Sequence, residues 1–412
     1  MNVLWIVNIV FPEVHAMLKG SGTLRASGGW IVSTAEELVK YPDVNLTVIS
    51  VSSNVKNMMF LEGEKIHYIL IPFCRNPKNY SYYYAIINEK VKPKVVHIHG
   101  TEYPYGWAWL QTMPCDNVVV SIQGLISVIA KYYRAGLSLK DIYTNITFHD
   151  LLRHSVIGEQ QDFYTRGEVE QQVLRKVNHV IGRTSFDKAH CMAINPKVDY
   201  HLCNETLRPE FYSGQWAYEN CRPHSIFMSQ ASYPIKGLHM LIKAMPLVLK
   251  EYPDAILRVA GKDITRRSDI NTKLRFTGYG NYLHKLINKY KLEDKITFLG
   301  PLDAEEMKRE YLKTNVFVSP SAIENSPNSI GEAQLLGVPV VASFVGGVMD
   351  MMKGDESNLY RYEEYEMMAR KICSIFSKRA ELPQLLFMQE QARKRHNVND
   401  NIMSLMTVYN NL

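Results

Sequence analysis

Two carboxylates with seven residues between them, Glu324 and Glu332, have the types and spacing best suited to chemistry in this chain. A short apolar run, 315–318, predicts a strand ahead of them, and the turn 325–328 lies between them. Residues 329–336 predict a helix that Gly337 and Pro339 end. Glu324 is then a loop acid that can accept hydrogen bonds from ligand hydroxyls. Glu332, in the first helical turn, can hold a diol such as a ribose.

The start of this predicted helix adds a second property. Free backbone amides near Asn328 and Ser329 favour an anion such as a phosphate. The same residues also have an interpretation without a ligand, because Ser329-x-x-Glu332 is a capping box and Glu324 can be an ordinary solvated acid. Taken alone, this stretch leaves both interpretations open.

Polar side chains also follow two predicted strands nearer the N-terminus. His99 and Glu102 follow the strand 95–98, and Gln123 follows the strand 118–122. In an open parallel sheet the carboxyl ends of strands face a ligand crevice. A hydrogen-bonded structural histidine is the alternative for His99.

Two helix starts complete the candidates. Lys236 lies between a predicted strand, 225–229, and a helix, 238–252, where a cation and free amides together suit a diphosphate. Gly28 and Gly29 precede a helix at 30–40, at the end of a long predicted loop, 11–27, and let a backbone approach a phosphate or a sugar. A solvated lysine and a plain turn are the respective alternatives.

Strand and helix patterns alternate along the chain, which predicts α/β architecture with parallel sheets. The 412 residues suggest two domains of roughly 200 residues each. A hydrophobic content of 46% supports an ample core, and a net charge of +6 suits anionic ligands or an anionic membrane surface. This charge is too small and dispersed to indicate nucleic acid.

The six scattered cysteines form no Cys-x-x-Cys pair, which favours free thiols in a reducing compartment. The apolar N-terminus has no basic region before it and reads as a first strand, and no run of 18 apolar residues predicts a membrane span. We therefore expect a cytoplasmic protein. The mixed apolar, aromatic and basic segment 126–164 is either a packed insert or a surface for a lipid-linked acceptor at a membrane.

The stretch from Glu324 to Ser343, with its seven-residue spacing and the Gly346-Gly347 turn beyond, resembles the signature of retaining GT-B glycosyltransferases of family 4, the glycosyl transferases group 1. The resemblance is strongest over 225–351. It implies two Rossmann-like domains whose parallel sheets face a deep interdomain cleft. Residues 1–206 would be the acceptor-side domain and 207–394 the donor domain, with a C-terminal helix at about 395–412 packing back on the first.

The resemblance also implies a function: a hexosyltransferase that moves a sugar from a UDP- or GDP-linked donor to a hydroxyl of a glycan or polyprenyl-linked acceptor, with retention of configuration, in polysaccharide or glycan biosynthesis. Peripheral contact with the inner face of a membrane belongs to this expectation. No Asp-x-Asp occurs, so neither a metal nor a cofactor besides the nucleotide sugar is expected. The roles implied are catalytic for Lys236 and Glu324, donor-binding for these two with Gly28, Gly29, Leu302, Asn328, Ser329 and Glu332, and acceptor-side for His99, Glu102 and Gln123.

Two positions depart from the family pattern. Ala231 stands where an arginine usually binds the donor phosphates, and Gln123 stands where a histidine is common. Arg266 or Arg267 is a candidate replacement for the missing guanidinium. A sugar-nucleotide epimerase, and a catalytically weak nucleotide-sugar-binding partner of another transferase, therefore stay open as alternatives.

Overall fold

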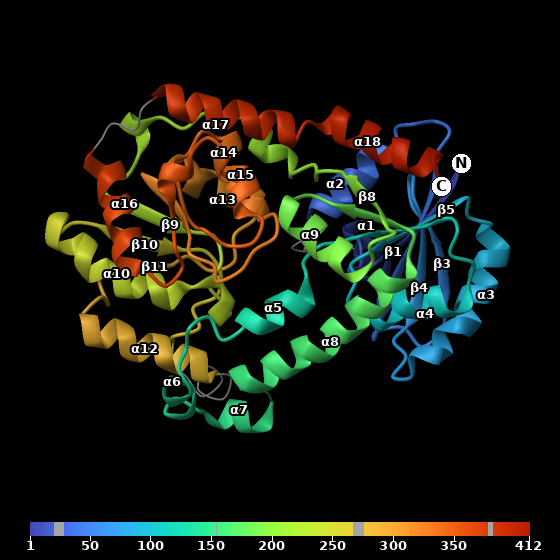
Figure 1. Cartoon of the computed structure of the whole chain (residues 1–412), viewed down its shortest axis with the longest axis horizontal. Helices are drawn as coiled ribbons and strands as arrows, with labels where there is room; N and C mark the ends of the chain where they lie inside the picture. The colour runs from blue at the N-terminus through green and yellow to red at the C-terminus, as the bar shows by residue number, and fades with distance from the viewer. Residues whose placement is uncertain (20–28, 154, 267–275, 378–381) are drawn as a thin grey trace. The chain divides into compact units, whose positions relative to one another are not determined.

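The computed structural model describes residues 1–19, 29–153, 155–266, 276–377 and 382–412, and the chain divides into two compact units (Figure 1). Unit 1 comprises Met1–Ser127, Thr165–Arg208 and His396–Leu412. Unit 2 comprises Val128–Tyr164 and Pro209–Arg395. The sequence placed residues 128–164 in the first domain, whereas the structure groups them with unit 2.

Buried polar contacts explain this assignment. The carbonyl oxygen of Ala135 accepts hydrogen bonds from His239 Nε2 and from the Tyr362 hydroxyl, each at 2.8 Å. The Thr147 hydroxyl donates to the carbonyl oxygen of Phe276 at 2.6 Å. Residues far apart in sequence thus satisfy one another's polar groups, and none of these pairings follows a local pattern.

Unit 1 is built on one sheet with the strand order β3-β4-β2-β1-β5-β6-β7-β8. All described neighbours in it are parallel except β3 and β4. Its strands are β1 (Asn2–Val7), β2 (Asn45–Ser52), β3 (Met59–Glu62), β4 (His67–Pro72), β5 (Val95–His99), β6 (Val118–Ser121), β7 (His179–Gly182) and β8 (Asp199–Leu202). The central strands are buried along most of their length, as expected for a parallel sheet covered on both faces.

Helices surround this sheet. They are α1 (Pro12–Lys19), α2 (Gly29–Leu38), α3 (Tyr80–Val91), α4 (Pro104–Thr112), α9 (Ser185–Ile194) and α18 (Val398–Asn410), while α5 (Ile126–Tyr132) and α8 (Val156–Lys176) pass from one unit into the other along the chain. The prediction of a long loop at 11–27 is wrong for residues 12–19, because they form α1. In Figure 1 the red α18 lies beside the blue elements of unit 1, where the Tyr409 hydroxyl accepts a hydrogen bond of 2.9 Å from Trp5 Nε1.

Unit 2 has a fully parallel sheet in the described residues, with the order β11-β10-β9-β12-β13-β14. The strands are β9 (Ser225–Met228), β10 (Ile256–Val259), β11 (Ile296–Phe298), β12 (Val316–Ser319), β13 (Val340–Ser343) and β14 (Leu359–Tyr360). In chain order this is 3-2-1-4-5-6, the order of dinucleotide-binding sheets. The order reverses between β9 and β12, which is where such sheets bind ligands. The expected α/β architecture with two parallel sheets is confirmed.

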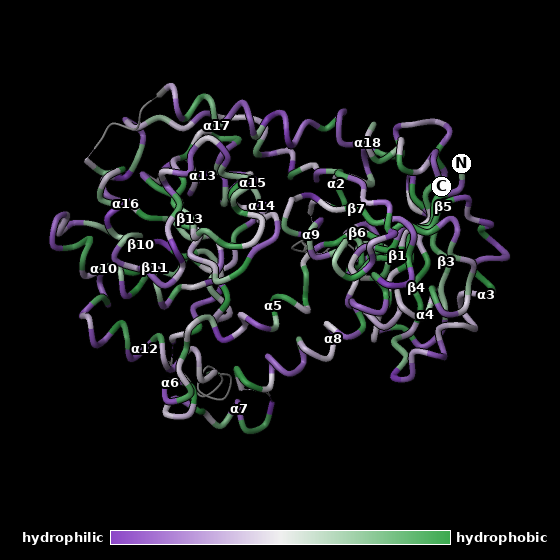
Figure 2. The backbone as a smooth tube through the Cα atoms, in the orientation of Figure 1, coloured by the Kyte–Doolittle hydropathy of each residue, from purple (hydrophilic) through white to green (hydrophobic). Residues whose placement is uncertain are grey.

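The helices of unit 2 are α6 (Leu139–Tyr143), α7 (Phe148–Leu152), α10 (Leu238–Glu251), α12 (Gly278–Tyr290), α13 (Ala304–Leu312), α14 (Asn328–Leu335), α15 (Val348–Met351), α16 (Tyr365–Ser377) and α17 (Leu382–Arg395). The apolar face of α10 is buried through Leu238, Leu241, Ile242 and Met245. Figure 2 shows hydrophobic residues concentrated in the strands at the centre of each unit. No described helix is both long and apolar enough to cross a membrane.

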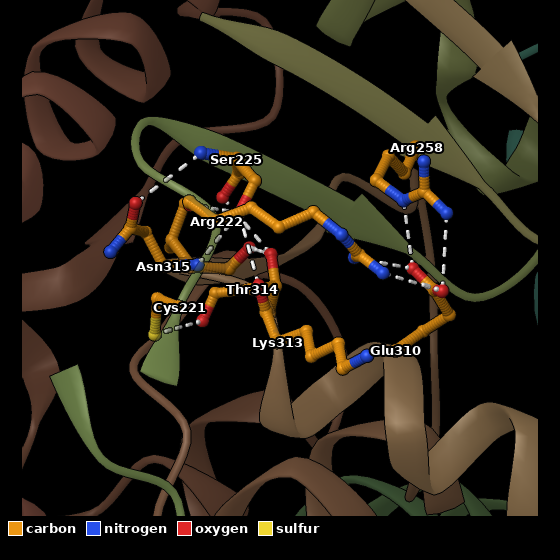
Figure 3. Close-up of polar contacts among 9 residues, drawn as sticks. Cys221, Arg222, Ser225, Arg258, Glu310, Lys313, Thr314 and Asn315 are labelled. Carbon is orange, nitrogen blue, oxygen red and sulfur yellow. Dashed lines mark hydrogen bonds and ion pairs between the residues drawn. The ribbon is translucent and has the colours of Figure 1, made fainter. Parts of the chain in front are cut away.

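A cluster of charged residues ties α13 to the sheet of unit 2 (Figure 3). The Glu310 carboxylate receives two hydrogen bonds from Arg222, at 2.9 and 3.1 Å, and two from Arg258, at 2.8 and 3.1 Å. Burial alone would raise the pKa of Glu310, but the hydrogen bonds from the two guanidinium groups outweigh it and lower this pKa. Arg222 precedes β9 and Arg258 belongs to β10, so the cluster anchors α13 beside these two strands.

Candidate functional site

The candidate site of unit 2 centres on an ion pair. Lys236 Nζ lies 2.6 Å from Glu324 Oε1, and the side chains are 26% and 15% exposed. Lys236 ends a short 3-10 turn, Pro234–Lys236, that follows β9, and Glu324 lies in the loop after β12. The two predicted residues therefore meet at the reversal of strand order in the sheet. The Ser321 hydroxyl donates to the same carboxylate oxygen at 2.7 Å and helps to hold it in place.

Close backbone packing fixes this arrangement. Gly237 has φ of +75°, and a Cβ placed on it would lie 1.7 Å from the carbonyl oxygen of Pro320. A Cβ on Gly346 would lie 2.0 Å from the carbonyl oxygen of Glu324, and the Gly347 amide donates to this oxygen at 3.0 Å. Only glycine permits these two approaches. The loops that carry Lys236 and Glu324 are therefore rigidly placed.

Helix α14 begins at Asn328, one residue earlier than predicted, with Pro327 as its N-cap. No side-chain hydrogen bond caps it, so the capping-box interpretation of Ser329 and Glu332 is wrong. Asn328 and Ser329 occupy its first turn and are partly exposed, whereas Glu332 is buried. The first-turn amides are thus positioned to meet an anion, and Glu332 lies one turn deeper.

The remaining donor-side candidates are more scattered. Leu302 is partly exposed in the loop after β11, which a backbone bridge between Gly261 and Gly300 joins to the end of β10. Ala231 is buried, so this position offers no phosphate contact from a side chain. Arg266 is exposed, and Arg267 and Gly28 lie outside the described residues. Gly29 is the first residue of α2, where a Cβ would lie 3.0 Å from side-chain carbons of Arg208.

In unit 1, two of the predicted residues belong to a polar cluster at the carboxyl ends of β1, β5 and β6. Asn8 Nδ2 donates to Gln123 Oε1 at 3.3 Å and to the Tyr103 hydroxyl at 3.0 Å. Glu102 is buried and accepts a hydrogen bond of 3.1 Å from Arg166. This cluster offers amide, hydroxyl and carboxylate groups that can bind hydroxyls.

The structure places His99 differently, inside the packing of unit 1. Its side chain is 3% exposed, and its ring lies 3.8 Å from that of His97 and 4.4 Å from that of Trp5 between centroids. Neither ring nitrogen has a hydrogen-bond partner among the described residues. Burial, with a smaller contribution from His97, lowers the pKa of His99 well below its usual value. His99 is therefore neutral near pH 7.

Sequence reasoning missed several residues that the structure adds to these sites, namely Asn8, Arg166 and Ser321. Asn8 directly follows β1, so the same strand-end argument that selected Gln123 would have found it. Arg166 lies on α8, and only the tertiary fold brings it to Glu102. Among the described residues no group of three or more His, Cys, Asp or Glu side chains is arranged to hold a metal ion.

The second part of the chain is similar to known proteins. Residues 219–395 match the family model described as glycosyl transferases group 1. An uncharacterized glycosyltransferase of Methanocaldococcus jannaschii, MJ1607, is 30% identical over 140 residues, 33% of this chain and 31% of the relative. A D-inositol 3-phosphate glycosyltransferase of Pseudarthrobacter chlorophenolicus is 32% identical over 234 residues, 52% of each protein. The alignments thus span about half or less of these relatives.

Solved structures resemble the chain over its whole length. Sucrose-phosphate synthase from Thermosynechococcus elongatus has a TM-score of 0.69 at 17% identity and covers 99% of this chain and 98% of its own. The Anabaena protein HepE, solved in complex with UDP, has a TM-score of 0.65 at 14% identity, with all of both chains covered. At this identity the likeness shows the fold alone. The expected fold, GT-B with two Rossmann-like parallel-sheet domains, is confirmed.

Proposed function

We propose that this protein is a glycosyltransferase that moves a sugar from a UDP- or GDP-linked donor to a hydroxyl of a glycan or lipid-linked acceptor. The observation that carries the proposal is the Lys236–Glu324 pair at the strand-order reversal, within the segment 219–395 that matches the glycosyltransferase family. The similarity to a D-inositol 3-phosphate glycosyltransferase, and the UDP bound in the HepE structure, are consistent with it.

In this proposal Lys236 and the first-turn amides of α14 bind the donor diphosphate. The acceptor oxygen forms a bond to the anomeric carbon as the bond to the diphosphate breaks, and negative charge grows on the departing phosphate, which takes up the acceptor's proton. A fixed cation and oriented amides stabilise that charge without reorganising. Glu324 exchanges its bond to Lys236 for hydroxyls of the donor sugar. Metal independence and retention of configuration are part of the proposal.

Further contacts complete the assignment. Glu332 holds the ribose, Leu302 packs against the base, and Gly29 approaches the bound substrates. Glu102 and Gln123 bind hydroxyls on the acceptor side. His99 keeps its proposed acceptor-side role through the packing that it gives to the end of β5, since its ring is buried.

We also propose peripheral contact with an anionic membrane, through a surface that we call the α6–α7 patch. Large apolar side chains are exposed on it, and they are Leu139, Tyr143, Ile146, Phe148, Leu151 and Leu152. Figure 2 marks hydrophobic residues along α7. The carboxylates of Asp141 and Asp150 are occupied as helix caps, while Lys140 and Arg153 are exposed. An apolar surface with exposed cations suits an anionic lipid surface.

The test of the enzymatic proposal is Lys236→Ala. We expect release of nucleoside diphosphate from a panel of UDP- and GDP-sugars, with acceptor present, to fall by about 100-fold, by analogy with a lost oxyanion donor. Lys250→Ala, at the exposed end of α10, is the matched control and should leave turnover unchanged. Equal turnover in the two variants would remove Lys236 from its role. Product analysis with and without acceptor separates transfer from epimerisation.

A further inference from the structure

A cavity of about 760 Å³ lies within unit 2, beside the Lys236–Glu324 pair. It is lined by residues of four stretches, 131–139 without Tyr133, 322–323, 344–346 and 361–363. Its volume is within the range of small-molecule sites. It shares Leu139 with the α6–α7 patch, and none of the catalytic or substrate-binding roles proposed above uses it.

The lining of this cavity is positively charged. Lys131, Arg134 and Arg361 line it, against one carboxylate, that of Glu363. None of the three cations forms an ion pair with a carboxylate in the part of the chain that the structure describes. Unpaired cations around a cavity attract an anion, and arginine can hold a phosphate or carboxylate through two parallel hydrogen bonds.

Exposed aromatic rings accompany these cations. Tyr132 and Phe344 line the cavity and are 50% and 51% exposed. An aromatic face offers a rigid, apolar surface at a small entropic cost, and the C–H face of a sugar ring is a suitable partner for it. Cations beside aromatic faces therefore favour a saccharide that carries a negative charge over a simple inorganic anion.

One wall of the cavity is held in place. Ala135 has φ of +51°, which is unfavourable for a residue with a side chain. Its carbonyl oxygen is fixed by His239 Nε2 and the Tyr362 hydroxyl, each at 2.8 Å. Backbone strain of this kind persists only where the surroundings enforce it, and it clusters at ligand sites. The wall is thus preformed.

The cavity also adjoins the residue proposed to hold the donor sugar. Ile323 lines it and directly precedes Glu324. Gly346 lines it too, packed so closely that a Cβ would lie 2.0 Å from the carbonyl oxygen of Glu324. A molecule in the cavity would therefore lie next to the donor sugar.

We propose that this cavity binds an anionic saccharide, with its phosphate or carboxylate on Lys131, Arg134 and Arg361 and its ring on Tyr132 and Phe344. We identify this saccharide as the acceptor. That identification rests on the proposed glycosyltransferase function, whereas the binding of an anionic saccharide does not.

The test is ligand-observed NMR on the full-length protein, with UDP or GDP present so that the donor site is filled. The probes are glucose 1-phosphate and glucuronate, with glucose as the neutral control. We expect at least one charged probe to bind and glucose to bind far more weakly. Arg134→Gln and Arg361→Gln should each weaken binding by about tenfold or more, as expected for a lost hydrogen bond to a charged group. Arg309→Gln, an exposed arginine on α13, should change nothing.

A further variant tests recognition of the sugar ring separately from recognition of its anionic group. Phe344→Ser should weaken binding of the charged saccharide while leaving binding of inorganic phosphate as it was. Binding of neither charged probe, binding of glucose as tight as that of glucose 1-phosphate, or unchanged affinity in both arginine variants would overturn the inference. Failure of UDP and GDP to bind would instead count against the proposed function, and binding of the charged probes would still support the anionic site.

Discussion

Gly237 lies where the backbone after β9 passes closest to the loop after β12. We predict that Gly237→Ala destabilises the protein more than Gly300→Ala. Both glycines have φ of +75°, but a Cβ on Gly300 would meet nothing within 4 Å. The control should lose roughly 1 kcal/mol from strain alone, and the clash at Gly237 should add about 1–3 kcal/mol. Urea unfolding measures both, and equal losses would contradict the packing described.

Glu324 holds Lys236 by an ion pair while also repelling an anionic ligand. We predict that Glu324→Gln binds UDP or GDP several-fold more tightly than the original protein but transfers sugar more slowly. The first effect follows because Lys236 loses its internal partner, and the second because the donor sugar loses an acceptor of hydrogen bonds. Titration calorimetry and a turnover assay check the two effects. Glu305→Gln, on the exposed side of α13, is the control.

The two stacked histidines of β5 make the stability of unit 1 depend on pH. Burial lowers the pKa of His97 to about 3 and lowers that of His99 as well. Both are neutral when folded and bind protons near pH 6.5 when unfolded. Their stabilising contribution is therefore full above pH 6.5 and is lost progressively as the pH falls towards 3.

We accordingly predict that His99→Phe reduces the loss of stability on acidification. Each buried neutral histidine contributes at most about 1.4 kcal/mol per pH unit in this range. Urea unfolding at several pH values from 7 to 5 should show a shallower decline for His99→Phe than for the original protein. An unchanged slope in His99→Phe would show that folding does not lower the pKa of His99.

At the scale of one residue, the sequence was sufficient to predict the place of a site residue that directly follows a strand. Lys236 and Glu324 were predicted from their positions after two strands, and a parallel sheet brings such positions together. The burial of His99 was not predictable in this way. His97 and His99 share one face of β5, and they are covered by aromatic rings from other elements, namely Trp5 of β1, Trp30 of α2 and Tyr409 of α18.

One carboxylate of helix α13, that of Glu310, binds two arginines. We predict that Glu310→Gln lowers the stability of unit 2 by roughly 1–3 kcal/mol, since it weakens hydrogen bonds to charged groups that are partly exposed. The pKa of Glu310 is lowered in the folded state, so the stabilisation is complete above its ordinary value and is lost as the pH falls through the folded pKa. The difference between variant and original should therefore shrink in acid.

Thermal or urea unfolding at neutral pH and near pH 3 checks this prediction. Glu305→Gln, whose partner Lys308 lies 4.0 Å away at the surface, is the matched control and should be close to neutral. A constant difference between Glu310→Gln and the original at both pH values would contradict the assigned pKa shift.

At the scale of elements, the buried strands and α10 were predictable because their apolar residues repeat with a clear period. The elements missed lack that signal. Strand β3 is a short edge strand with alternating partial exposure, paired antiparallel to β4. Helix α8 is mostly polar and has no apolar stripe with a clear period.

For the whole molecule, we predict that the α6–α7 patch directs the protein to anionic vesicles. The double change Phe148→Ser with Leu151→Ser should reduce co-sedimentation with phosphatidylglycerol-containing vesicles by about tenfold or more, because apolar area no longer leaves water. High salt should weaken binding of the original protein. Phe73→Ser with Leu202→Ser, two exposed residues of unit 1, is the matched control. Equal losses in both double variants would assign no special role to the patch.

The division into units was predicted from chain length and resemblance, with a boundary near residue 206. The assignment of 128–164 to unit 2 was not, because it depends on the carbonyl of Ala135, the ring of His239 and the hydroxyl of Tyr362 meeting in three dimensions. Hydrogen bonds between residues more than a hundred positions apart produce no periodic pattern in a sequence.

The segment 128–164, which belongs to unit 2, limits where the chain can be cut to give a fragment that folds. A fragment that contains only the matched stretch, 219–395, would lack the segment 128–164. Three side chains that are buried in the full-length protein would then be exposed to water where this segment is missing, namely His239, Tyr279 and Tyr362. The Gly278 amide would also lose its hydrogen bond of 3.1 Å to the Asp150 carboxylate. The segment 219–395, which matches the family model, is therefore shorter than unit 2, the part of the chain that has to fold for the site to form.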